Sequence, residues 1–188
     1  GLAQRWPADA RNSLLERALL QGERVRSAVA AHPGFAFIQS KRDLEALLAR
    51  RARGEKAVGA LLGTEGAHAL DGELDSIERL YAAGFRMVGL QHFFDNRLGG
   101  SLHGESQSGL TDFGKRAVRV MQARGILIDV AHSSEATVHD TLQETGGAAL
   151  IVSHTGFNGH CPSPRNISDE TMAMIAEAGG LIGVGFWA

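Results

Sequence analysis

Five short apolar runs alternate with stretches of helical periodicity along the 188 residues, and this alternation restricts the fold more than any other feature. Each run is rich in valine, isoleucine or leucine and is flanked by glycine, as is typical of strands that are buried on both faces of a sheet. The five predicted strands lie at residues 57–63, 85–90, 126–131, 148–153 and 181–186.

The segments between these runs carry apolar residues at helical spacing, and glycine follows each of them. Serine or threonine before a helix and glycine after it are the preferred caps. Strands that alternate with helices in this way predict a parallel sheet, either closed into a barrel or doubly wound. The predicted helices lie near residues 74–84, 113–125, 134–145 and 168–179.

The first part of the chain has a different pattern, with longer helical stretches. Ser40 with Asp43 three residues later is a variant of the capping box, which predicts a helix start. We therefore expect a helical segment, residues 1–56, that packs on a barrel part, residues 57–188. The elements predicted within the first segment are helices at 9–31 and 40–53 and a short extended piece at 35–38.

Charge and cysteine content limit the partners and the compartment. The formal net charge is −2, which gives no electrostatic reason to expect nucleic acid or anionic lipid. Cys161 is the single cysteine, so neither an internal disulfide nor a cysteine-based zinc knuckle can form. No apolar run approaches the roughly 20 residues of a membrane span, and the residues given contain no signal peptide. The compartment stays open between cytoplasm and export.

Residues able to bind a metal follow four successive predicted strands. Glu65 comes after the first, His92 after the second, His132 after the third and His154 after the fourth. In a βα-barrel the C-terminal ends of the strands build the active site. Neutral imidazole is a good zinc ligand, so the pattern favours zinc over magnesium. A single histidine at a strand end is usually structural, and Glu65 could instead orient His68.

Arg165 lies in the loop after the fourth predicted strand, in the sequence Pro-Ser-Pro-Arg-Asn. An arginine at this position suits bidentate capture of a substrate carboxylate. The alternative is a surface arginine without a role in a site.

Several motifs together resemble the membrane (renal) dipeptidase family of zinc-dependent dipeptidases, in the family's order and with similar spacings. The resemblance is specific over about residues 58–186, so the chain looks like the central portion of such a protein. The motifs are GTEGAH at 63–68, LQH at 90–92, GLTDFG at 109–114, IDVAHS at 128–133 and SH at 153–154, with Arg165 and Asn166 following.

The resemblance implies a TIM-like (β/α)8 barrel, of which the chain carries about five βα units plus N-terminal helices. It also implies two zinc ions and a metal-bound hydroxide that hydrolyses the peptide bond of a dipeptide. Glu65 matches the bridging carboxylate, and His132 and His154 match ligands of the second zinc. His92 matches a substrate-binding histidine that stabilises the oxyanion, and Arg165 matches an arginine that contacts the substrate. Dimers are common in the family, so a homodimer is one assembly to expect.

The sequence also departs from the family pattern. The family's first zinc needs a His-x-Asp pair, which occurs nowhere in the chain, and a late aspartate of the family has no counterpart. Ligands for one zinc are therefore clearly present. Two alternatives stay open at this point. One is a non-catalytic or truncated homologue that acts as a binding or scaffold protein, and the other is a different metal-dependent amidohydrolase, such as a deaminase or lactonase.

Overall fold

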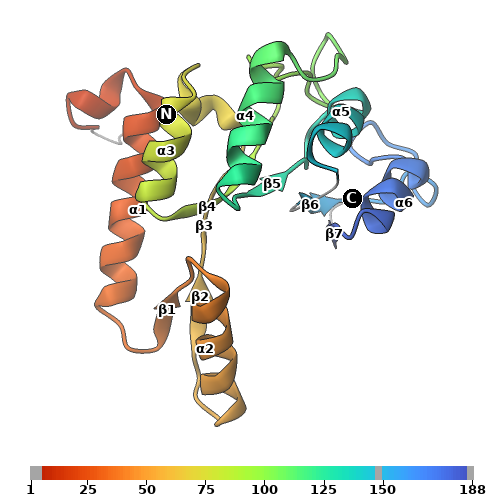
Figure 1. Cartoon of the computed structure of the whole chain (residues 1–188). Coiled ribbons are helices and arrows are strands. Elements are labelled where there is room, and N and C mark those ends of the chain that lie inside the picture. The colour runs from red at the N-terminus through yellow and green to blue at the C-terminus, as the bar shows by residue number, and fades with distance from the viewer. Residues whose placement is uncertain (1–5, 147–149, 186–188) are drawn as a thin grey trace.

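The computed structural model describes residues 6–146 and 150–185 of the chain. A parallel sheet has the strand order β3-β4-β5-β6-β7, which is also the order along the chain (Figure 1). A helix connects each pair of neighbouring strands from β3 to β7, so the predicted parallel α/β fold is confirmed. The strands are β3 (Leu62–Thr64), β4 (Phe85–Gly89), β5 (Leu127–Asp129), β6 (Leu150–Thr155) and β7 (Leu181–Val184).

The strand predicted at residues 57–63 is wrong in one respect, because the chain divides it between two sheets. β2 (Val58–Ala60) pairs in parallel with β1 (Phe35–Phe37), whereas β3 pairs with β4. The pairing changes at Leu61, and the register of β3 shifts between Leu62 and Gly63. Of the strands predicted at 148–153 and 181–186, residues 148, 149 and 186 lie outside the described residues.

Two of the connecting helices begin at serines that the sequence predicts as caps, whereas the helix that follows Leu74 has no side-chain cap. The side chain of Ser134 accepts a hydrogen bond from the Thr137 amide at the start of α5, and Ser168 accepts one from the Thr171 amide at the start of α6. After α3 and α4, Gly84 and Gly125 adopt positive φ angles of 97° and 67°, a conformation that glycine adopts without steric cost. The four connecting helices are α3 (Asp75–Ala82), α4 (Asp112–Ala123), α5 (Glu135–Thr145) and α6 (Asp169–Glu177).

The N-terminal helices also follow the prediction, with one difference. The stretch 9–31 is not continuous, because the short 3-10 helix η1 (Asp9–Arg11) ends before Ser13 caps α1 (Leu14–Ala30). Ser40 caps α2 (Lys41–Ala52) and exchanges hydrogen bonds with Asp43, which confirms the capping-box variant. β1 pairs with β2 across residue 56, and the division of the chain at that point stays a prediction.

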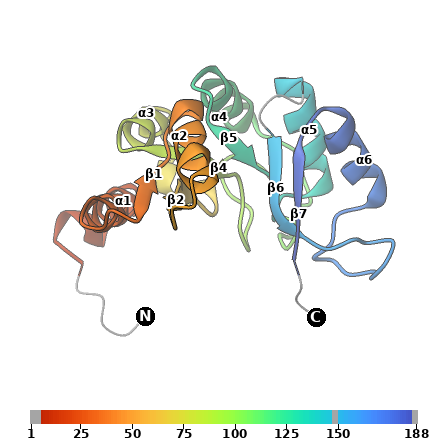
Figure 2. The same cartoon turned by 90° about the horizontal axis from the view of Figure 1, so that it is seen from below.

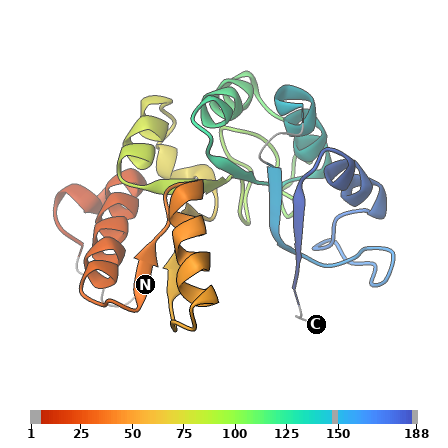
Figure 3. The same cartoon turned by 60° about the horizontal axis from the view of Figure 1, so that its bottom comes forward.

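The main core lies between the sheet and the helices on its outer side. Figure 2 shows α3 to α6 following one another around this side of the curved sheet. Ile77, Val88 and Ile128 are fully buried there. In a separate small cluster, Leu47 of α2 packs with Ile38 and Ala57. Helix α2 stands with β1 and β2 beside α1 (Figure 3).

The two ends of the strand order are less covered. Leu181 in β7 is 69% exposed, and Val58 and Leu61 around the break between β2 and β3 are 49% and 42% exposed. None of the helices in the part of the chain that the structure describes is both long and apolar enough to span a bilayer.

Candidate metal centre

Three side chains from β3, β5 and β6 converge at the carboxyl edge of the sheet. The Nε2 atom of His132 lies 3.1 Å from Oε1 of Glu65 and 3.0 Å from Nε2 of His154. The third side of this triangle, from His154 Nε2 to Glu65 Oε1, is 3.4 Å. These are the residues that the sequence predicts as metal ligands, and their ligand atoms form a group that could hold a metal ion.

The strands explain this convergence. β3, β5 and β6 are parallel, so their carboxyl ends meet at one edge. Glu65 directly follows β3, and His132 lies three residues after the end of β5. His154 lies inside β6 rather than after it, because that strand continues to Thr155, beyond the predicted end at residue 153. The Ser153 hydroxyl lies 2.8 Å from Nδ1 of His154 and orients the ring.

His132 has an unusual backbone conformation. Its φ angle is 70°, in the left-handed region that few residues other than glycine adopt. A residue held there costs about 1–3 kcal/mol, and such conformations concentrate at functional sites. The turn directs the imidazole back over the sheet edge, where its side chain is 6% exposed, whereas the Glu65 side chain is 55% exposed.

The electrostatic environment keeps His132 neutral. Burial is the largest of the causes that lower the pKa of His132 to about 4, and the charge of Arg165 lowers it further. The hydrogen bond to Glu65 opposes this shift but does not overcome it. At neutral pH the imidazole therefore carries no charge and offers a lone pair, the form in which histidine binds a metal.

The donor set fits a metal of the zinc type. Ligands with bonds of 2.0–2.1 Å in a tetrahedron are separated by about 3.3 Å, close to the three observed separations. Two imidazole nitrogens and one carboxylate oxygen are also the ligands of catalytic zinc sites, which keep a fourth position open. Without a cation, the facing Nε2 atoms of His132 and His154 could share at most a proton.

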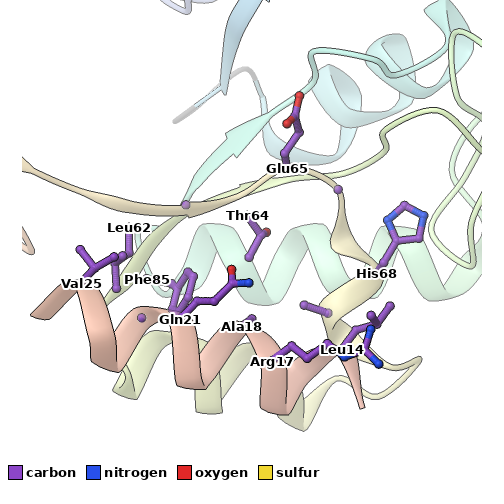
Figure 4. Close-up of a pocket in the computed structure, with 14 residues that line it drawn as sticks. Leu14, Arg17, Ala18, Gln21, Val25, Leu62, Thr64, Glu65, His68 and Phe85 are labelled. Carbon is purple, nitrogen blue, oxygen red and sulfur yellow. The ribbon is translucent and has the colours of Figure 1, made fainter. Parts of the chain in front are cut away.

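Glu65 also lines a cavity beside β3. The cavity has a volume of about 440 Å³ and lies between α1 and β3, where Gln21, Thr64 and His68 contribute to its lining. In Figure 4 the Glu65 carboxylate points away from α1, and the His68 ring lies beyond the turn that follows Glu65. Burial lowers the pKa of His68, and this histidine does not belong to the group of three ligands.

The structure places His92 and Arg165 beside the triangle, as the sequence predicts. His92 Nε2 lies 3.6 Å from Glu65 Oε1, and its ring centre lies 4.6 Å from that of His132. One guanidinium nitrogen of Arg165 donates to the His154 carbonyl at 3.2 Å. Burial lowers the pKa of the Arg165 guanidinium, while the nearby carboxylates of Glu65 and Asp129 raise it.

Residues that sequence reasoning did not single out also reach this edge. The His103 ring lies 5.6 Å from the His132 ring and 5.4 Å from that of Phe93, which is 52% exposed. Their loop is rich in glycine, and no periodicity indicates which of its side chains return to the sheet. The remaining described histidines, His32, His139 and His160, also lie outside the group of ligands.

Asp129 fixes the backbone next to both histidine ligands. This buried carboxylate is 3% exposed and accepts hydrogen bonds from the amides of Ala131 and Ser153, at 3.0 and 2.9 Å. Each of these amides lies next in sequence to a ligand, His132 or His154. The signal in the sequence is an aspartate inside an apolar strand, where an ionised side chain must have partners.

We expect Asp129→Ala to lower the free energy of unfolding by roughly 2–6 kcal/mol, because two amides lose their acceptor and each such loss costs about 1–3 kcal/mol. Asp129→Asn retains one carbonyl oxygen and should cost clearly less. Urea unfolding followed by circular dichroism measures both values. Equal losses in the two variants would contradict the role of Asp129 as an acceptor.

Comparisons with known proteins agree with these features. A model of the membrane dipeptidase family, peptidase family M19, matches residues 4–188. An uncharacterized protein in the pqqA 5′ region of Klebsiella pneumoniae is 32% identical over 142 residues, which are 72% of this chain and 52% of that protein.

Solved structures resemble the chain in the same way. An amidohydrolase from Pseudomonas aeruginosa superimposes with a TM-score of 0.80 at 25% identity, over 90% of this chain and 50% of that one. A metallopeptidase from Rhodobacter sphaeroides, bound to a phosphinate mimic of the dipeptide L-Ala-D-Ala, superimposes with a TM-score of 0.70 at 26% identity, over 88% of this chain and 47% of that one.

The chain spans about half the length of these relatives. The family match nevertheless covers nearly all of its residues, and the fold is the α/β fold of the TIM-barrel-like neighbours. The chain belongs to the membrane dipeptidase family, peptidase family M19.

Proposed function

We propose that the protein is part of a zinc metallodipeptidase, which hydrolyses the peptide bond of dipeptides. The observation that carries this proposal is the triangle of Glu65, His132 and His154, whose separations of 3.0–3.4 Å suit one tetrahedral ion. Membership of the M19 family supports it. The pKa of His132, lowered to about 4, keeps that ligand available at neutral pH.

Each residue has a defined task in this proposal. Glu65, His132 and His154 would hold the ion. Zinc, when bound, supplies positive charge that makes a water molecule more acidic and polarises a carbonyl group. His92, whose side chain is 34% exposed, can donate a hydrogen bond to the carbonyl oxygen of the substrate as negative charge develops there.

Arg165 would bind the substrate carboxylate. Its guanidinium is partly buried beside the triangle, where a charge-assisted bidentate contact is stronger than in water. A dipeptide has a carboxylate one residue from its scissile bond, so this contact would fix the peptide carbonyl near His92. The Rhodobacter sphaeroides metallopeptidase, whose structure holds a mimic of L-Ala-D-Ala, supports dipeptides as the substrate class.

The test is hydrolysis of L-Ala-L-Ala and L-Ala-D-Ala by the zinc-loaded protein, read as released alanine by mass spectrometry. We expect turnover that a chelator stops and added zinc restores. Glu65→Gln keeps the size of the side chain but removes its charge, and should lower turnover by about 100-fold or more, since even residues behind a metal ligand contribute 10–100-fold.

Calorimetric titration with the phosphinate mimic of L-Ala-D-Ala reads the site independently of turnover. Binding that requires zinc would support the proposal even where hydrolysis is slow. If the zinc-loaded protein neither bound the mimic nor hydrolysed the dipeptides, the proposal would be overturned and a scaffold role favoured.

A further inference from the structure

The loop between β4 and α4 joins the backbones of two histidines of the site. Ser101 in this loop is fully buried. Its hydroxyl oxygen lies 2.5 Å from the carbonyl oxygen of His92 and 3.2 Å from that of His132. The hydroxyl proton can be donated to either carbonyl, so this one side chain contacts both chain segments.

Backbone contacts around Ser101 extend the connection. The amide of Leu102 donates to the His132 carbonyl at 2.7 Å, and the amide of Ser134 donates to the Gly100 carbonyl at 3.0 Å. Ser101 and Ser133 form an isolated antiparallel bridge. The loop thus continues the hydrogen bonding of the sheet into the segment that carries His132.

The regular strand pairing ends before the histidines begin. The last pair of the β4–β5 ladder is Gly89 with Asp129, and the Leu90 amide still donates to the Asp129 carbonyl. His92 and His132 lie beyond this point, with their ring centres 4.6 Å apart. The contacts of Ser101 replace the missing ladder at the place where the two side chains must be held together.

The loop itself is fixed around Ser101. Asp95 accepts hydrogen bonds from the amides of Ser101 and Ser106, at 2.8 and 2.9 Å. The Ser101 hydroxyl also accepts from the amide of His103 at 3.1 Å, and His103 approaches the His132 ring. Contacts within the loop therefore fix the position of Ser101, and Ser101 in turn fixes the loop against the segments of His92 and His132.

We propose that Ser101 is a positioning residue, which holds the metal ligand His132 in place through its carbonyl group, beside His92, and so tunes metal affinity. This inference rests on the metal site proposed above. Residues that hold a ligand from behind typically change metal affinity by 10–100-fold when they are mutated. Ser101 acts on the backbone rather than on a ring nitrogen, so the lower end of that range is expected.

The test compares Ser101→Ala with Ser106→Ala. Both remove one hydroxyl from the same loop, but the Ser106 hydroxyl contacts Ser108 and Asp95 and neither histidine. We expect the zinc dissociation constant, measured by competition with a chelating dye, to rise about 10-fold in Ser101→Ala. Ser106→Ala should match the wild-type protein within about 2-fold.

Hydrogen exchange in the zinc-free protein gives a second readout, at the Leu102 amide that donates to His132. Exchange there should become about 10-fold faster or more in Ser101→Ala, while amides of β5 keep their protection. Unchanged Leu102 exchange, wild-type zinc affinity in Ser101→Ala, or an equal loss in Ser106→Ala would overturn the inference. A wild-type protein without zinc affinity would instead overturn the metal site, and exchange at the Leu102 amide would still test whether Ser101 holds the His132 segment.

Discussion

Replacement of His132 by alanine is expected to remove zinc from the protein. His132 makes the two shortest contacts within the triangle, since its Nε2 atom lies 3.1 Å from Oε1 of Glu65 and 3.0 Å from Nε2 of His154. Without it the remaining pair is one carboxylate and one imidazole, too few donors for a tetrahedral site. Affinity should fall by more than about 100-fold, because the loss of a direct ligand exceeds the 10–100-fold effect of residues behind a ligand.

The measurement is zinc per chain by plasma mass spectrometry after exhaustive buffer exchange. The wild-type protein should retain close to one zinc and His132→Ala close to none. His32→Ala is the matched control, because it also removes an imidazole, from an exposed position outside the group of ligands. Wild-type zinc content in His132→Ala would contradict the site, as would a wild-type protein that binds no zinc.

A value close to two would have a different meaning. The described residues offer one group of three ligands, so a second zinc would need donors outside that group. Loss of both ions in His132→Ala would then indicate a shared ligand, and Glu65 is the suitable candidate because a carboxylate can bridge two metals.

The convergence of the ligands could be predicted because it follows from topology alone. Parallel strands that are joined by helices bring their carboxyl ends to one edge, so residues that follow these strands lie near one another. The sequence places Glu65, His132 and His154 after the first, third and fourth apolar runs, and the order β3-β4-β5-β6 keeps these runs within one sheet. Periodicity and cap residues sufficed for that step.

The supporting contacts could not be predicted, because they depend on how loops fold back in three dimensions. Ser101 contacts His132 from 31 positions away in the sequence, through a loop with no periodic pattern. The division between β2 and β3 has the same origin, since the apolar run 57–63 is continuous in sequence and its break at Leu61 is set by two different pairing partners. Local propensity carries no information on such partners.

Arg165 provides the second large effect. If it binds the substrate carboxylate, Arg165→Met should lower kcat/KM for L-Ala-L-Ala by about 100- to 1000-fold, within the 2–5 kcal/mol typical for loss of one partner of a buried charge pair. Arg165→Lys keeps the charge but not the planar pair of donors, so it should recover only part of the loss. The guanidinium also donates to the His154 carbonyl, so a purely structural effect must be separated from a contact with substrate.

Alaninamide at the second position of the dipeptide makes this separation, because it keeps the scissile bond and removes the carboxylate. In the wild-type protein the amide should be hydrolysed about 100-fold less efficiently than the free acid, in line with the cost of leaving Arg165 without its anion. In Arg165→Met the two substrates should become nearly equal, since the group that distinguishes them is gone. If hydrolysis of the amide falls as far as that of the acid, Arg165 acts by holding the His154 segment, and recognition of the carboxylate must lie elsewhere.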